Sequence, residues 1–208
     1  MRKIIKGAEP KQLTQWKRAN TTLRYRDLPA EERQSVRSSC IEEQYGLCAY
    51  CCQSIVVDDA HNEHIEAQDR TPKRTLDFTN IVASCQRPNQ CGHGRKTQPI
   101  DLTPLMAECE SELKFYLSGR VAGQTERAKE SIKTLNLGHT DESNRGLIGA
   151  RKKLVDDLIF TGGMSPDELE DEELLGILLD DLLKPKEGRL QPFSPVLVNV
   201  IRHYLAQP

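Results

Sequence analysis

The sequence lacks the long apolar run that a membrane-spanning helix requires. No stretch of about 18 consecutive apolar residues occurs in the chain, so we expect no membrane span. The N-terminus is basic but lacks an apolar core of signal-peptide length. The chain also lacks internal repeats and long low-complexity tracts. Together these absences predict a cytoplasmic globular protein.

The sequence has little net charge, −2 at neutral pH, but the charge is unevenly distributed. Residues 1–100 carry 16 lysines and arginines against 12 aspartates and glutamates, whereas residues 101–208 carry 13 against 19. Because nucleic acid is a polyanion, we expect it to bind the first half more readily than the second. The proportions of apolar residues (37%) and charged residues (29%) are typical of a soluble protein.

The chain lacks an even number of cysteines. It has seven, so they cannot all pair in disulfides. In a cytosolic chain, clustered cysteines more often bind metal or carry out redox chemistry. Cys48 and Cys51 form a CxxC pair, and Cys85 and Cys91 form a second, wider pair. No βαβ pattern surrounds the CxxC, which disfavours a redox motif. We therefore predict that these four thiolates bind a structural Zn²⁺, with Cys52 as an alternative ligand to Cys51.

Three segments differ in their residue patterns. We predict a helical segment at residues 1–46 and a mostly helical region at residues 99–208. Between them, we predict a compact region at residues 47–98, with strands at the runs "SIVV" (54–57) and "EHIEA" (63–67). The middle segment has few bulky apolar residues, so we expect a metal to hold it together. The pattern as a whole predicts an α+β fold.

Several helices can be predicted from apolar periodicity and from end signals. Pro29 and Gly46 are expected near the two ends of the second helix, and Cys40 and Cys109 are expected to be small core residues. A capping-box pattern at 165–168 is expected to open a leucine-rich helix. The expected helices cover residues 10–20, 28–46, 125–138, 141–160, 165–183 and 195–206, and a strand and turn are expected at 113–123.

Polar residues suited to catalysis lie within and beside the cysteine pairs. They are Glu63 and His64 in "NEHI", Asn80 in "NIVASC" and His93 in "CGHGRK". A neutral imidazole with a pKa near 6.5 can take a proton from water at cellular pH. Each residue taken singly has an ordinary structural explanation, so only the joint pattern indicates function. His61 would face the opposite side of a strand from His64, and its part in metal binding stays open.

In order and spacing, these motifs resemble the HNH endonucleases, a ββα-metal nuclease family. That family shows an acidic residue or histidine followed by histidine, then an asparagine before a cysteine, then a histidine beside the last cysteine. The resemblance covers residues 47–98, although the spacing of Cys85 and Cys91 is longer than usual. It implies a zinc-stapled ββα-metal (HNH) nuclease core that hydrolyses phosphodiester bonds in DNA, or in RNA such as tRNA.

The resemblance also implies a role for each residue. His64 would be the general base, and Glu63 and His93 would bind a catalytic Mg²⁺ or Mn²⁺ ion. Asn80 would fix the loop and orient His64 through hydrogen bonds. Two basic residues that follow in the chain are expected to contact phosphates beside the cut: Arg95 and Lys96.

The first 46 residues extend the resemblance. The opening pattern IxKGxEPxxLxxWK, followed by a helix and "LCAYC", is similar to the PtuB-type HNH nucleases of Septu and retron-linked anti-phage systems. This similarity implies a PtuA-type ATPase as a partner and, in some systems, a retron reverse transcriptase with its multicopy single-stranded DNA. The acidic, leucine-rich run 165–183 is expected to lie away from nucleic acid and to carry the partner contact. The alternatives are a non-catalytic zinc-stapled nucleic-acid-binding module and an adaptor with a vestigial core.

Overall fold

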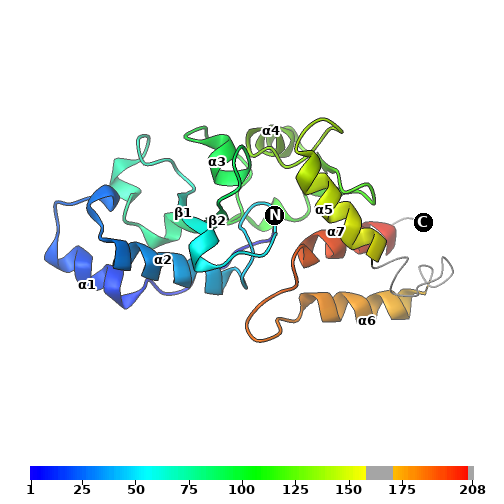
Figure 1. The fold of residues 1–208 in the computed structure, drawn as a ribbon, viewed down its shortest axis with the longest axis horizontal. Helices are drawn as coiled ribbons and strands as arrows, with labels where there is room; N and C mark the ends of the chain where they lie inside the picture. Colours follow the sequence, from blue (N-terminus) through cyan, green and yellow to red (C-terminus); the bar gives the residue numbers. More distant parts are fainter. Residues whose placement is uncertain (158–170, 206–208) are drawn as a thin grey trace.

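The computed structural model describes residues 1–157 and 171–205, and this part of the chain is an α+β protein (Figure 1). It contains seven α-helices and two small antiparallel sheets. The helices are α1 (Lys11–Ala19), α2 (Ala30–Glu43), α3 (Cys91–Arg95), α4 (Glu126–Thr134), α5 (Arg145–Asp156), α6 (Glu172–Leu183) and α7 (Ser194–Leu205). The strands are β1 (Ala60–His64), paired with β2 (Ile81–Cys85), and β3 (Leu113–Phe115), paired with β4 (Val121–Gly123).

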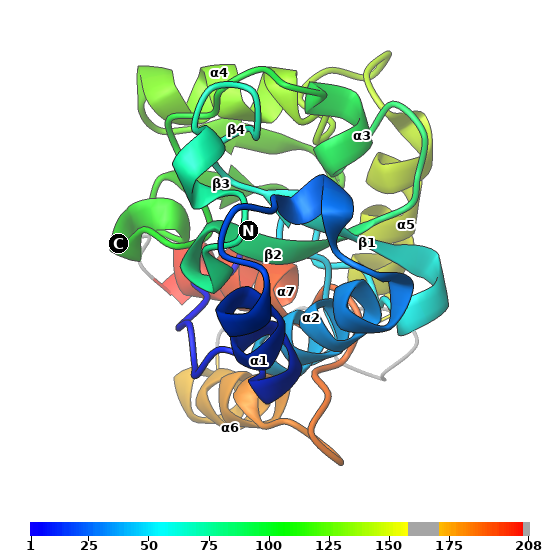
Figure 2. The ribbon, with the colours of Figure 1, turned by 90° about the vertical axis from the view of Figure 1, so that its left-hand side faces the viewer.

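The two predicted N-terminal helices are confirmed as α1 and α2. Helix α2 follows Pro29, and it buries Val36, Cys40 and Ile41 on one side. Gly46 has a φ of +74° and donates its N–H to the Ile41 carbonyl over 2.8 Å, which closes the end of the helix. The apolar side of α2 packs against the β1–β2 hairpin, so the N-terminal segment supports the central region directly (Figure 2).

The central region consists of a hairpin followed by a short helix. Ala60 pairs with Cys85 and His64 pairs with Ile81, and the long connection 65–80 joins the two strands. The strand-like run "EHIEA" therefore contributes only its first two residues to β1. The run "SIVV" at 54–57 is not a strand. Asp59 accepts a 2.7 Å hydrogen bond from the Val56 N–H, which favours a turn immediately before β1.

One main core extends from Met1 and Leu13 to Val200, so it draws on all three sequence segments. A second, smaller core joins α5, α6 and α7 through Val155, Leu175 and other apolar residues. Helix α7 meets β3 through the Asn199 side chain, whose oxygen accepts from the Phe115 N–H and whose amide donates to the Leu113 carbonyl. The last helices are thus attached to the main core rather than forming a separate unit.

The predictions for the rear half are largely confirmed where the structure describes it. The strand and turn at 113–123 form the β3–β4 hairpin, and Thr125 caps α4 by accepting from the Ala128 N–H. The capping pattern at 165–168 lies outside the described residues. Within them, α6 begins at Glu172 with Asp171 as its cap. No helix in the described part of the chain is long and apolar enough to cross a membrane.

Candidate metal centre and active site

The four predicted zinc ligands meet at one buried point. Cys48 and Cys51 lie in the turn after α2, Cys85 ends β2, and Cys91 begins α3. All four are buried and free, and their sulfur atoms lie within 4.8 Å of one another. A tetrahedral zinc site with Zn–S bonds of about 2.3 Å has its sulfurs about 3.8 Å apart. The cluster is therefore compatible with a structural zinc.

Hydrogen bonds around the centre already favour a negatively charged sulfur. Burial by itself would raise the pKa of the Cys48 thiol, but hydrogen bonds from Cys51, Cys85 and Cys91 lower it well below the usual value. The Cys85 N–H also donates to Cys48 Sγ over 3.4 Å, and Gln90 Nε2 donates to Cys85 Sγ over 3.7 Å. Backbone and amide donors of this kind are typical of the surroundings of a metal thiolate.

A buried arginine lies close to this centre. The side chain of Arg151, on α5, is 0% exposed, and its Nη1 donates to the Leu137 carbonyl over 2.7 Å. Its Nε and Nη2 have no hydrogen-bond partner among the described residues. Burial lowers the pKa of Arg151, and the neighbouring thiols of Cys51, Cys52 and Cys91 partly offset this shift. A zinc ion with four thiolates carries a charge of −2, which this cation would offset.

The three remaining cysteines lie outside the cluster of four. Cys40 and Cys109 are fully buried in the main core, as predicted. Burial raises the pKa of both thiols to about 12, which makes them unreactive. Cys52 is buried too, with a φ of +64°, and the sulfur atom that joins the cluster is that of Cys51.

Three polar side chains meet at one face of β1: His61, Glu63 and His93. His61 and Glu63 lie two residues apart and share this face, with 3.4 Å between His61 Nε2 and Glu63 Oε2. His93 reaches the same place from α3, and its ring centre lies 4.4 Å from that of His61. Gly92, on α3, packs closely against His61 and Glu63. A Cβ atom at this glycine would lie 2.6 Å from both His61 Nε2 and Glu63 Oε2, so a larger residue would not fit.

Arg95 holds Glu63 in place from within the protein. Its Nε lies 2.6 Å from Glu63 Oε1 as an ion pair, and its other nitrogens donate to the carbonyls of His64 and Ile65. The side chain is only 1% exposed. Arg95 therefore ties α3 to the end of β1, and its burial does not suit the phosphate contact expected for it. Lys96 is exposed.

His64 lies on the opposite face of β1, towards the N-terminal helices. Its Nε2 lies 2.9 Å from the Thr75 carbonyl oxygen, and its ring meets the Tyr25 ring edge-on at 4.6 Å. Because a carbonyl only accepts hydrogen bonds, Nε2 carries the proton in the neutral ring and Nδ1 holds the free lone pair. Burial lowers the pKa of His64, so the ring is neutral near pH 7.

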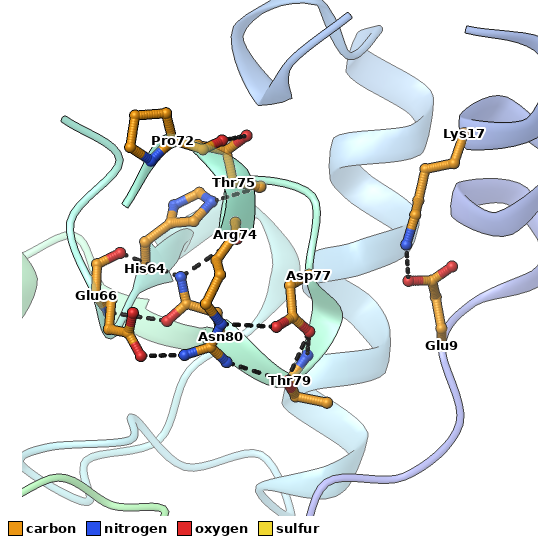
Figure 3. A network of polar contacts seen from close by, with 10 residues as sticks. All are labelled: Glu9, Lys17, His64, Glu66, Pro72, Arg74, Thr75, Asp77, Thr79 and Asn80. Carbon is orange, nitrogen blue, oxygen red and sulfur yellow. Dashed lines mark hydrogen bonds and ion pairs between the residues drawn. The ribbon is translucent and has the colours of Figure 1, made fainter. Parts of the chain in front are cut away.

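Asn80 closes the loop that carries Thr75 (Figure 3). Its side-chain oxygen accepts from the Glu66 N–H over 2.8 Å, and its amide donates to the carbonyls of Glu66 and Arg74. These bonds suit the expected role in fixing the loop. The contacts that orient His64 come from Thr75 and Tyr25, so Asn80 acts on His64 only through the loop.

An open pocket of about 260 Å³ lies where β1 ends and α3 ends. It brings four of the predicted residues to one place: Glu63, His64, Arg95 and Lys96. A neutral imidazole, a carboxylate and an exposed ammonium group therefore border the same space. Proton transfer and the binding of an anionic substrate are both possible chemistry for this set.

Some residues of this site carried no usable signal in the sequence. Tyr25 touches His64 from a segment far away in the chain, and its hydroxyl accepts from Asn62 Nδ2 over 2.7 Å. Arg151 and Gly92 likewise gain their significance only from contacts made in the fold. No family model and no curated protein matches this chain, so its function is inferred from the residues themselves.

Proposed function

We propose that this protein is a metal-dependent endonuclease of the HNH (ββα-metal) type, which hydrolyses phosphodiester bonds in DNA or RNA. The proposal rests on the order of the elements in the central region and on the residues that they place at one pocket. A hairpin and a short helix follow one another as β1, β2 and α3, and Glu63 and His64 line the same open pocket. A structural zinc in the four-cysteine cluster would join the two ends of this region.

His64 is the general base in this proposal. The Thr75 carbonyl holds the ring so that Nδ1 has the free lone pair, and burial keeps the ring neutral. A proton from the attacking water passes to Nδ1 while the water oxygen bonds to phosphorus and the P–O3′ bond breaks. The exposed ammonium group of Lys96, at the pocket edge, attracts the phosphate backbone.

Glu63 and His93 would hold the catalytic ion, expected to be Mg²⁺ or Mn²⁺. The donor types fit such a group, because Arg95 pairs with Oε1 of Glu63 and leaves Oε2 on the side where the His61 and His93 rings lie. When bound, the ion would stabilise negative charge on the phosphate and on the departing oxygen. Arg95 keeps the carboxylate in one orientation for this purpose.

The PtuA-type ATPase, with a retron reverse transcriptase and its DNA in some systems, is the proposed partner. Helix α6 supports a contact there, because Ile177 and Leu183 are 62% and 44% exposed on it. Its first turn carries Glu172 and Glu173, which would keep this surface away from nucleic acid. In this proposal the nuclease acts as the effector of an anti-phage system.

A nicking assay on supercoiled plasmid and on tRNA tests the proposed activity. We expect cleavage by the zinc-loaded protein with Mn²⁺ or Mg²⁺, none after addition of EDTA, and a loss of about 10²- to 10⁴-fold in His64→Ala. His203→Ala, on α7, is the matched control and should cleave normally. Binding without cleavage of either substrate would instead favour the non-catalytic nucleic-acid-binding module.

A further inference from the structure

We infer that His61 is a third ligand of the catalytic ion, and that the site prefers a transition-metal cation such as Mn²⁺, Co²⁺ or Ni²⁺ to Mg²⁺. This inference rests on the proposed function, because it concerns the ion that the nuclease would use. The sequence pattern assigns only Glu63 and His93 to that ion. His61 is added by its position in the fold.

The first reason is the spacing of two donor atoms on β1. His61 Nε2 and Glu63 Oε2 lie 3.4 Å apart on the same face of the strand. Metal bonds of about 2.1 Å place two ligand atoms about 3.0 Å apart in octahedral geometry and about 3.4 Å apart in tetrahedral geometry. The two atoms are therefore already at the separation of two ligands of one ion.

The second reason is the close approach of the α3 backbone to these two atoms. A Cβ atom on Gly92 would lie 2.6 Å from each of them. Because glycine has no side chain, the backbone of α3 can pack closely against both donor atoms, and a larger residue would push them out of place. This second observation does not depend on the distance between His61 and Glu63.

A simple ion pair between His61 and Glu63 is a weaker explanation of this contact. Glu63 already has a cation in Arg95, whose Nε lies 2.6 Å from Oε1. A second cation is therefore not needed to neutralise the carboxylate. His93 also faces His61, with ring centres 4.4 Å apart and a 51° tilt between the rings. Two imidazoles and a carboxylate form a donor set for a divalent ion.

His93 would complete the set by a small movement. In the described part of the chain, the cysteine cluster is the only group of three or more donors whose atoms all lie within 4.8 Å of one another. The His93 ring is exposed, and its Nε2 lies 3.0 Å from Gln86 Oε1. A turn of this ring away from Gln86 would bring a nitrogen towards His61 and Glu63. Closure of the ligand set would then accompany metal binding.

The donor types decide which ion is preferred. Imidazole suits transition metals, whereas Mg²⁺ prefers oxygen donors and gives up its water reluctantly. With His61 included, two of the three protein ligands are nitrogen atoms. The stability order of divalent metals rises from Mn²⁺ through Co²⁺ to Ni²⁺ at such sites.

Metal binding can be measured without reference to cleavage. Zinc-loaded full-length protein would be titrated with Mn²⁺, and free Mn²⁺ would be followed by electron paramagnetic resonance. We expect one site in the wild type, and at least about tenfold weaker binding in His61→Ala and in Gly92→Ala. His64→Ala and the matched control His139→Ala should keep wild-type affinity. His61→Asn, a smaller change in shape and polarity, serves as the second variant, and circular dichroism confirms that each protein is folded.

The outcomes separate the inference from the proposed function. Wild-type protein that neither binds Mn²⁺ outside the cysteine cluster nor cleaves nucleic acid would overturn both. Wild-type protein that binds and cleaves, with unchanged Mn²⁺ affinity in folded His61→Asn, would overturn the inference alone. Higher cleavage rates with Mg²⁺ than with Mn²⁺ or Co²⁺ at equal occupancy would also contradict it.

Discussion

Loss of one zinc ligand should unfold the central region, and Cys85→Ser is the clearest test. Cys85 ends β2 and its sulfur is buried within the four-cysteine cluster. Serine has nearly the same size but a hydroxyl that is a poor zinc ligand. The substitution therefore removes the metal bond while leaving little empty space. A zinc ion there would join the turn after α2, the end of β2 and the start of α3, so its loss would release three segments from one another.

The expected effect is large compared with the stability of a typical domain. Binding of structural zinc contributes about 10–16 kcal/mol in small metal domains, whereas whole domains are stable by about 5–15 kcal/mol. Loss of even half of the zinc contribution would leave little stability. We expect Cys85→Ser to be insoluble, or to be purified without zinc and without a cooperative thermal transition.

Metal analysis and thermal denaturation provide the measurements, and Cys109→Ala is the matched control. Cys109 is also fully buried, but it lies outside the cluster. Its truncation should cost about 1 kcal/mol, a few degrees in melting temperature, and leave one zinc per chain. The absence of zinc from pure wild-type protein would refute this reasoning, as would equal melting temperatures for Cys85→Ser and Cys109→Ala.

Three further predictions concern other parts of the molecule. Arg151→Met should release zinc to a chelator about 10- to 100-fold faster than the wild type, because the positive charge near the thiolates is lost. Arg151→Lys, which keeps a charge, should be intermediate. Equal release rates would show that the charge is not needed. Burial lowers the pKa of His64, so the unfolded chain binds its proton more tightly than the folded protein. The free energy of unfolding should thus fall as the pH drops below about 6.5, measured by urea denaturation, and His64→Ala should weaken this dependence. Charge reversal at Glu172 and Glu173 should reduce co-purification with the ATPase without changing basal nicking, and full binding would place the contact elsewhere.

Local signals explain what could be predicted of the fold. The ends of α2 follow from Pro29 and Gly46, because proline fixes φ before the first turn and glycine allows the positive φ that ends the helix. The strand expected at 54–57 was wrong, because the bond between Val56 and Asp59 competes with strand pairing. A side chain that bonds to a nearby backbone group is difficult to recognise from apolar alternation alone.

The sequence by itself indicated that two cysteine pairs would meet, since a CxxC turn and a second pair can converge on one ion, and the structure decided for Cys51 over Cys52. It also placed Glu63 and His64 next to each other on a strand. Only the tertiary structure decided that Arg95 is buried against Glu63 and that Arg151 is fully buried. The sequence around an arginine does not show whether its side chain is exposed to solvent or is buried beside a negative charge. Which of the two applies depends on the path of the chain around it, because burial and charge pairing are made by residues distant in the sequence.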